Sequence, residues 1–160
     1  MPFEMDIQQL RDFLKDDVRM RTDFESTDQN TGVPMPPVQK PLPENAKAVP
    51  LPDWRGVVKL EAPLTQLIAG RKSLRKYAAE GITAEELSFL LWATQGVRDQ
   101  TPGRVLRNVP SAGNRHSMET YLALTQEVMD SQGSLLFIQG VWRYLPLQHA
   151  LVYVHSPENL

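Results

Sequence analysis

The sequence predicts an α+β protein in which helices pack on an antiparallel-rich sheet. Helical spacing of apolar residues occurs in three segments, residues 6–18, 63–70 and 83–96. Strand-like patterns occur in three later segments, residues 120–124, 141–144 and 150–155. The last two alternate around Pro146, as the strands of a hairpin do. With 160 residues, 41% of them hydrophobic, the chain suits one domain with a modest core.

The first predicted element is an amphipathic helix over residues 6–18. Asp6 is its expected N-cap, and Gln9 stands three residues later, as a capping box requires. Its apolar stripe consists of Ile7, Leu10, Phe13, Leu14 and Val18.

A proline-rich segment follows at residues 33–52, with seven of the 13 prolines of the chain. Proline lacks a backbone donor and fixes φ, so we expect an extended arm that wraps over a surface or reaches another subunit. We therefore divide the chain into a helix and arm (1–52) and a compact part (53–160). As an alternative, the Pro34-x-x-Pro37 sequence could make the chain an interaction module that docks in an aromatic groove.

Two helices are predicted in the compact part. Pro63 begins the first at N1, Gly70 closes it, and its expected inward residues are Leu64, Leu67 and Ile68. Thr83 and Glu86 form a capping box for the second, which should end near Gly96. Its expected inward residues are Leu87, Leu90, Leu91 and Thr94, with Trp92 at a flank. We expect residues 97–109, which include Pro102 and Gly103, to form a polar loop.

Composition excludes several classes of function. The chain has no cysteine, which removes disulfides, thiolate nucleophiles and Cys-ligated metals. A net charge of −2 argues against a nucleic-acid surface, and no apolar run approaches a membrane span. No signal peptide is evident, and we expect a cytoplasmic protein. His116 and Glu119 are spaced for a metal on a helix, but two ligands are too few, and we expect no metal site.

Two short segments point to chemistry. Arg71-Lys72-Ser73-Leu74-Arg75 places three cations and a hydroxyl in five residues, a combination that suits a phosphate. Taken alone, it better fits a solvated basic turn at a helix C-terminus, where cations interact favourably with the helix dipole. Pro110-Ser111-Ala112-Gly113 is a turn of small residues against which a flat ring could lie, or simply an ordinary turn before a strand.

In combination, these segments make the chain resemble the nitroreductase family of flavin enzymes. Arg71, Lys72, Ser73 and Arg75 match the family motif that faces the FMN phosphate and ribityl chain. Pro110, Ser111, Ala112 and Gly113 match the turn that lies against the isoalloxazine ring, commonly contributed by the partner subunit. Residues 85–98 and 140–151 are similar to the branch of dehydrogenases that form thiazole and oxazole rings in peptides.

The resemblance implies FMN as cofactor, a homodimer, and hydride transfer between NAD(P)H, or the C–H of a small-molecule or peptide substrate, and an electron acceptor. Family members run well past 200 residues, so the fold is expected to be incomplete at its C-terminus. In the ring-forming branch, the residues assigned to substrate deprotonation lie in that later half, so no catalytic acid or base is assigned. Two alternatives are a non-catalytic remnant of the fold and an enzyme that another chain completes.

Overall fold

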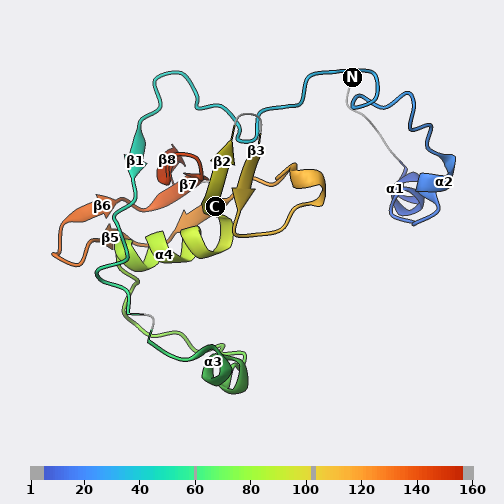
Figure 1. Cartoon of the computed structure of the whole chain (residues 1–160). Helices are drawn as coiled ribbons and strands as arrows, with labels where there is room; N and C mark the ends of the chain where they lie inside the picture. The colour runs from blue at the N-terminus through green and yellow to red at the C-terminus, as the bar shows by residue number, and fades with distance from the viewer. Residues whose placement is uncertain (1–5, 60, 102–103, 157–160) are drawn as a thin grey trace. The chain divides into compact units, whose positions relative to one another are not determined.

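The computed structural model describes residues 6–59, 61–101 and 104–156 (Figure 1). These residues form two compact units, one that ends at Pro36 and one that begins at Pro37. Helices and antiparallel sheets occur together, which confirms the predicted α+β class. Within the described ranges, the helices are too short or too polar to cross a bilayer. The division at residue 52 stays a prediction.

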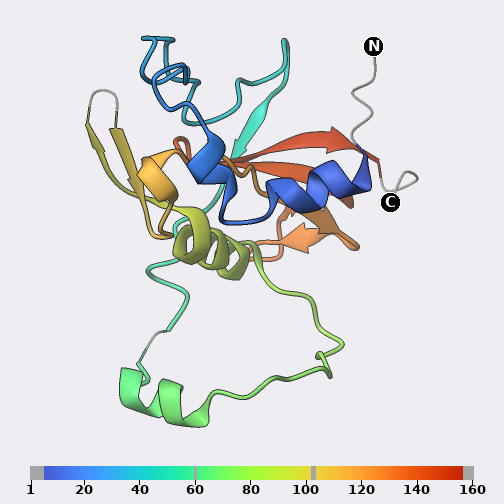
Figure 2. The same cartoon turned by 90° about the vertical axis from the view of Figure 1, so that its right-hand side faces the viewer.

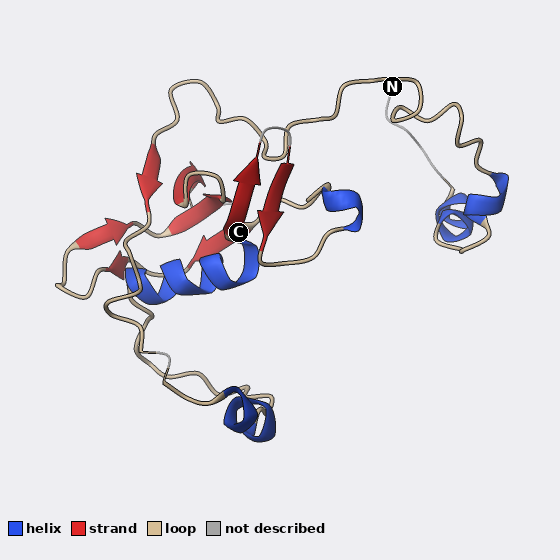
Figure 3. Cartoon of the chain, viewed as in Figure 1, coloured by secondary structure: helices blue, strands red, loops and turns tan. Residues whose placement is uncertain are grey.

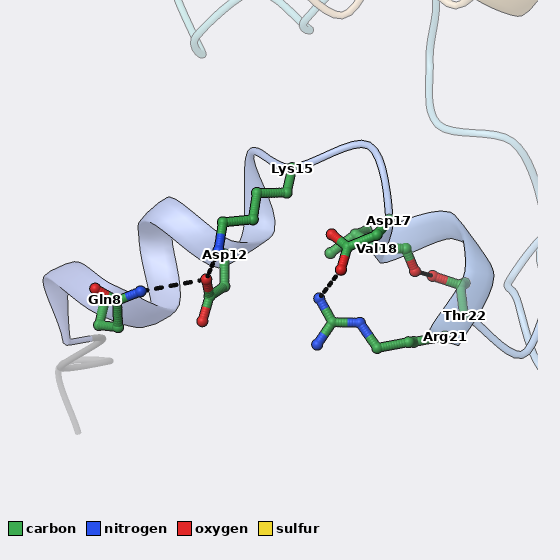
Figure 4. Close-up of polar contacts among 7 residues, drawn as sticks. All are labelled: Gln8, Asp12, Lys15, Asp17, Val18, Arg21 and Thr22. Carbon is green, nitrogen blue, oxygen red and sulfur yellow. Dashed lines mark hydrogen bonds and ion pairs between the residues drawn. The ribbon is translucent and has the colours of Figure 1, made fainter.

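The first unit contains two short helices, α1 (Ile7–Phe13) and α2 (Val18–Arg21). Asp6 caps α1 in the predicted capping box with Gln9. The prediction of one helix over 6–18 is wrong, because the chain turns after Leu14 and starts again after Asp17. Figure 4 shows polar contacts along both pieces: Lys15 binds Asp12, Arg21 binds Asp17, and the Thr22 hydroxyl donates to the Val18 carbonyl.

The second unit is built on a four-stranded sheet with the order β1-β8-β7-β4. Its strands are β1 (Ala48–Pro50), β4 (Tyr121–Leu124), β7 (Gly140–Leu145) and β8 (Ala150–His155). The predicted hairpin is confirmed, with Leu145 opposite Ala150. The predicted strand at 120–124 is also confirmed, and it pairs with β7. All six residues of β7 are buried, so this strand forms the centre of the sheet.

Four further strands were not predicted as strands. The segment expected to be a polar loop forms a hairpin of β2 (Val97–Thr101) and β3 (Arg104–Arg107), so that prediction is wrong. The turn residues Pro102 and Gly103 lie outside the described residues. A second small pair joins β5 (Val128–Met129) to β6 (Leu135–Phe137). Backbone pairing stabilises β2 and β3 although most of their side chains are polar, which hides them from a search for alternating apolar residues.

Helix α4 (Ala84–Gln95) packs against the sheet (Figure 2). The predicted Thr83–Glu86 capping box is confirmed. Leu87 and Leu91 are buried and share a core cluster with strand residues of β7 and β8, among them Trp142, Tyr144 and Leu151. Leu90 and Thr94 were expected to face inward, but they are exposed, and Ala84 and Ser88 are buried in their place.

Two buried arginines bind residues 38–41 of the proline-rich arm. Arg107 donates to the carbonyl of Val38 at 2.7 Å, and Arg143 donates to the carbonyl of Pro41 at 3.0 Å. The side chain of Gln39 accepts from the backbone of Leu147 and donates to Gln148. The backbone carbonyls of Val38 and Pro41 therefore accept hydrogen bonds from side chains of the second unit.

His149 lies at the centre of a hydrogen-bond chain that joins three elements. Its Nε2 is 2.8 Å from the Ser88 hydroxyl on α4, and its Nδ1 is 2.8 Å from the Tyr144 hydroxyl on β7. The Ser88 hydroxyl lies 2.6 Å from the Pro52 carbonyl, which can only accept. Ser88 must therefore donate to Pro52, and Nε2–H must donate to Ser88. In the neutral ring, Nδ1 then accepts from the Tyr144 hydroxyl.

The electrostatics agree with a neutral ring. Burial, and secondarily the charge of Arg55, lower the pKa of His149, and Asp53 opposes them. Burial likewise raises the pKa of the Tyr144 hydroxyl above its usual range, although Arg107 acts in the other direction. Both groups are therefore uncharged at neutral pH.

We predict that the free energy of unfolding falls as the pH falls below about 6.5. His149 has a lowered pKa in the folded chain and an ordinary value of 6.5 when unfolded, so below 6.5 the unfolded state binds more protons. The stabilisation is complete above 6.5 and is lost as the pH approaches the folded-state pKa. Urea unfolding at pH 7.5 and 5.5 measures it, and the His149→Gln variant should lose less stability between those pH values. An equal loss in both proteins would contradict the prediction.

Candidate functional site

The predicted phosphate segment lies on an exposed connection. It directly follows α3 (Leu64–Gly70), where Arg71 is the C-cap in extended conformation. Arg71, Lys72, Ser73 and Arg75 are all exposed. Across the part of the chain that the structure describes, none of these three cations pairs with a carboxylate. Their charges are therefore available to an anion from outside this chain.

Helix α3 does not bury the face that its sequence pattern suggests. Leu64, Leu67 and Ile68 were expected to point inward, but they are 70%, 55% and 69% exposed, so that prediction is wrong for this chain. Figure 3 shows loops on both sides of α3. All the residues from 61 to 82 are exposed. Leu74 and Tyr77, beside the cations, are exposed as well. The three apolar residues of α3 lie at helical spacing, but no described residue of this chain covers them.

The predicted ring-binding turn has the open shape that its composition suggests. Pro110, Ala112 and Gly113 are exposed and Ser111 is half-buried. Ala112–Asn114 form the short 3-10 helix η1. Gly113 has a φ of 59°, a left-handed conformation that favours glycine, and a Cβ there would touch only the side chain of Arg115 at 3.7 Å or beyond.

Hydrogen bonds within the turn fix its shape. The Ser111 hydroxyl accepts from the backbone N–H of His116 at 2.8 Å, and the Ser111 carbonyl accepts from that of Asn114 at 3.1 Å. The buried His116 ring binds the Asn114 side-chain oxygen through Nε2. Burial, and next the charge of Arg107, lower the pKa of His116. His116 thus supports the turn as a neutral ring, and Ser111 uses its hydroxyl as a local acceptor.

Asn108 attaches the turn to α4, a role that sequence reasoning missed. Its backbone N–H donates to the Gly96 carbonyl at 2.9 Å, and its side chain donates to the Trp92 carbonyl at 2.7 Å. A Cβ on Gly96 would come within 2.5 Å of the same Trp92 carbonyl, so only glycine fits this helix end. An Asn two residues before the Pro-Ser-Ala-Gly turn was the available signal.

The structure does not bring the two predicted segments into contact. Among the described residues, no hydrogen bond, ion pair or ring contact joins 71–75 to 110–113. The assignment of these eight residues to a flavin site therefore stays a prediction. The described residues also contain no group of three or more His, Asp or Glu side chains placed to hold a metal ion.

Comparison with known proteins identifies relatives of the second unit. The family model described as "Nitroreductase family" matches residues 68–151, which is more than half of the chain. A protein of Methanocaldococcus jannaschii named "Putative nitroreductase" is 34% identical over 98 residues. The alignment covers 61% of this chain and 44% of that relative, so the chain spans less than half the length of the curated relative it matches.

We predict that Arg107→Met releases the arm from the domain. Methionine keeps most of the buried volume but cannot donate to Val38, and a hydrogen bond from a charged donor contributes about 1.5–3 kcal/mol. Amide hydrogen exchange at residues 38–40, followed by mass spectrometry, should become roughly tenfold faster or more. Arg104→Met is the matched control, because Arg104 lies on the same strand and is exposed. Unchanged exchange in Arg107→Met would show that the bond does not hold the arm.

Proposed function

Because the chain belongs to the nitroreductase family, we propose that it is part of an FMN-dependent oxidoreductase. In this proposal, hydride passes through FMN between NAD(P)H or a substrate C–H and an electron acceptor. The observation that carries it is the family match over residues 68–151, which contains both the cation segment and the small-residue turn in the expected order.

The residues present fit the chemistry of FMN. The phosphate of FMN needs cations and hydroxyls that are not already occupied, and Arg71, Lys72, Ser73 and Arg75 are exposed. The flat ring needs a surface without bulky side chains, and the turn at Pro110–Gly113 offers small residues held by internal bonds. No dinucleotide fingerprint is present, which favours FMN over FAD.

Each segment has a separate role in the proposed site. FMN, when bound, supplies the redox chemistry, and the protein supplies position and charge. Arg71 and Lys72 would hold the phosphate, Arg71 by a two-point contact that lysine cannot make. Arg75 would place a positive charge at the N1 and O2 side of the ring. Pro110–Gly113 would support the ring face, and Asn108 would keep that turn fixed against α4.

We also propose a homodimer, in which α3 finds the surface that it lacks in one copy. Its exposed apolar residues continue into the cation segment through Leu74 and Tyr77. Burial of such residues stabilises by about 25 cal/mol per Å² of apolar surface, so this face suits a subunit interface. Relation to the ring-forming peptide dehydrogenases remains a proposal that rests on residues 85–98 and 140–151.

We predict that Arg71→Ala weakens FMN binding about tenfold or more, since one charge-assisted hydrogen bond accounts for a factor of that size. Arg71→Lys should recover only part of the loss. Quenching of flavin fluorescence at low and high salt measures the affinity. Arg98→Ala, an exposed cation on β2, is the matched control. Wild-type affinity of Arg71→Ala at both salt concentrations would reduce Arg71 to a surface cation.

The dimer is tested separately. We predict that Leu67→Asp combined with Ile68→Asp converts a dimer into a monomer at micromolar concentration, because a charge buried without a partner disfavours association. Light scattering measures the mass. Met118→Asp, at a residue that is 78% exposed and outside α3, should leave the mass unchanged. A stable wild-type monomer would count against the proposal.

A further inference from the structure

The second unit contains a pocket that the proposed flavin site does not use. It has a volume of about 420 Å³ and lies where the segment after β1 meets the end of α4 and the β7–β8 turn. Its apolar lining comes from Leu51, Pro52, Trp92, Val97, Pro146 and Leu147. None of the eight residues predicted to hold FMN lines it. The volume lies within the range of sites for small molecules.

One wall of this pocket consists of two tryptophans. The rings of Trp54 and Trp92 lie 4.9 Å apart at 40°, and Phe89 lies against Trp54 at 5.0 Å. Neither indole N–H donates to any described residue, although both side chains are half-buried. By contrast, the third indole, Trp142, donates to the Ile138 carbonyl in the core. The pocket wall therefore offers the flat apolar surface of two indoles whose N–H groups bind no described residue.

The polar lining also favours an acceptor-bearing ligand. Arg55 lies over the Trp54 ring at 5.1 Å, and one of its terminal nitrogens binds Asp53 at 3.0 Å. The remaining guanidinium donors face no described carboxylate other than Asp53. His149 lines the pocket too, but both of its nitrogens are already hydrogen-bonded to Ser88 and Tyr144. Asp53 also lines the pocket and binds Arg55 through Oδ1, so the donors that remain for a ligand are the other guanidinium nitrogens of Arg55.

We propose that this pocket binds a small planar aromatic carboxylate. The ring would lie on Trp54 and Trp92 opposite Pro146 and Leu147, where aromatic surface is favoured. The carboxylate would take the open donors of Arg55 and the indoles. This inference goes beyond the proposed redox function and does not depend on it, because it uses a different set of residues.

The probe is 2-naphthoate, titrated into the full ¹⁵N-labelled chain. The three indole N–H signals report the site directly, with Trp54→Phe and Trp92→Phe used to assign them. We expect the Trp54 and Trp92 signals to shift with a Kd of about 0.1–1 mM, the scale for a ligand of this size. The Trp142 signal should stay, because its N–H is already bonded in the core. Shifts in all three signals, or in none, would overturn the proposal.

Two comparisons separate the parts of the argument. Arg55→Gln should weaken 2-naphthoate about fivefold or more and leave the neutral 2-naphthamide unchanged, since only the charge-assisted contact is lost. Lys59→Gln, an exposed cation outside the pocket, should change neither. Equal losses for both ligands, or no loss, would show that Arg55 does not select an anion. Displacement of 2-naphthoate by FMN would show that the pocket belongs to the flavin site and is not separate.

Discussion

The fold of the second unit depends on the two hydrogen bonds of His149. Through Ser88 this ring binds α4 and, one bond further, the Pro52 carbonyl that follows β1. Through Tyr144 it binds the central strand. A single neutral imidazole therefore fixes the helix, the edge strand and the β7–β8 turn relative to one another. Because burial lowers the pKa of His149, the same arrangement makes the stability of this unit depend on pH below the ordinary value of histidine.

The proline-rich arm is attached by a different principle. The carbonyls of Val38 and Pro41 accept no backbone hydrogen bond among the described residues, and Arg107 on β3 and Arg143 on β7 donate to them instead. Burying an arginine is unfavourable unless its donors are satisfied, and the Nε of Arg107 has no acceptor among the described residues. The carbonyls of the arm therefore accept hydrogen bonds from two buried arginines, and the same bonds hold the arm on the domain. This mutual dependence places the arm end next to β3, which leads into the turn proposed to support the flavin ring.

Local signals made part of this structure predictable. The capping boxes at Asp6 and Thr83 and the alternation around Pro146 each depend on residues within a few positions, and each was predicted correctly. The hairpin of β2 and β3 was missed because its side chains are mostly polar and its stability comes from backbone pairing. The role of His149 could not be read from the sequence, since its partners lie 61 and five positions away and only the sheet brings them together. The proposed flavin residues have yet to be tested.

The arginines show why charge patterns alone cannot assign a site. Arg107 and Arg143 are buried in strands, and one terminal nitrogen of each donates to a backbone carbonyl. Arg71, Lys72 and Arg75 are clustered on an exposed connection, without carboxylate partners among the described residues. Clustered like charges repel one another when folded together, and an anion offsets that repulsion. The exposed segment is the better candidate for a phosphate because its cations have no carboxylate partner among the described residues, whereas Arg107 and Arg143 already bind backbone carbonyls.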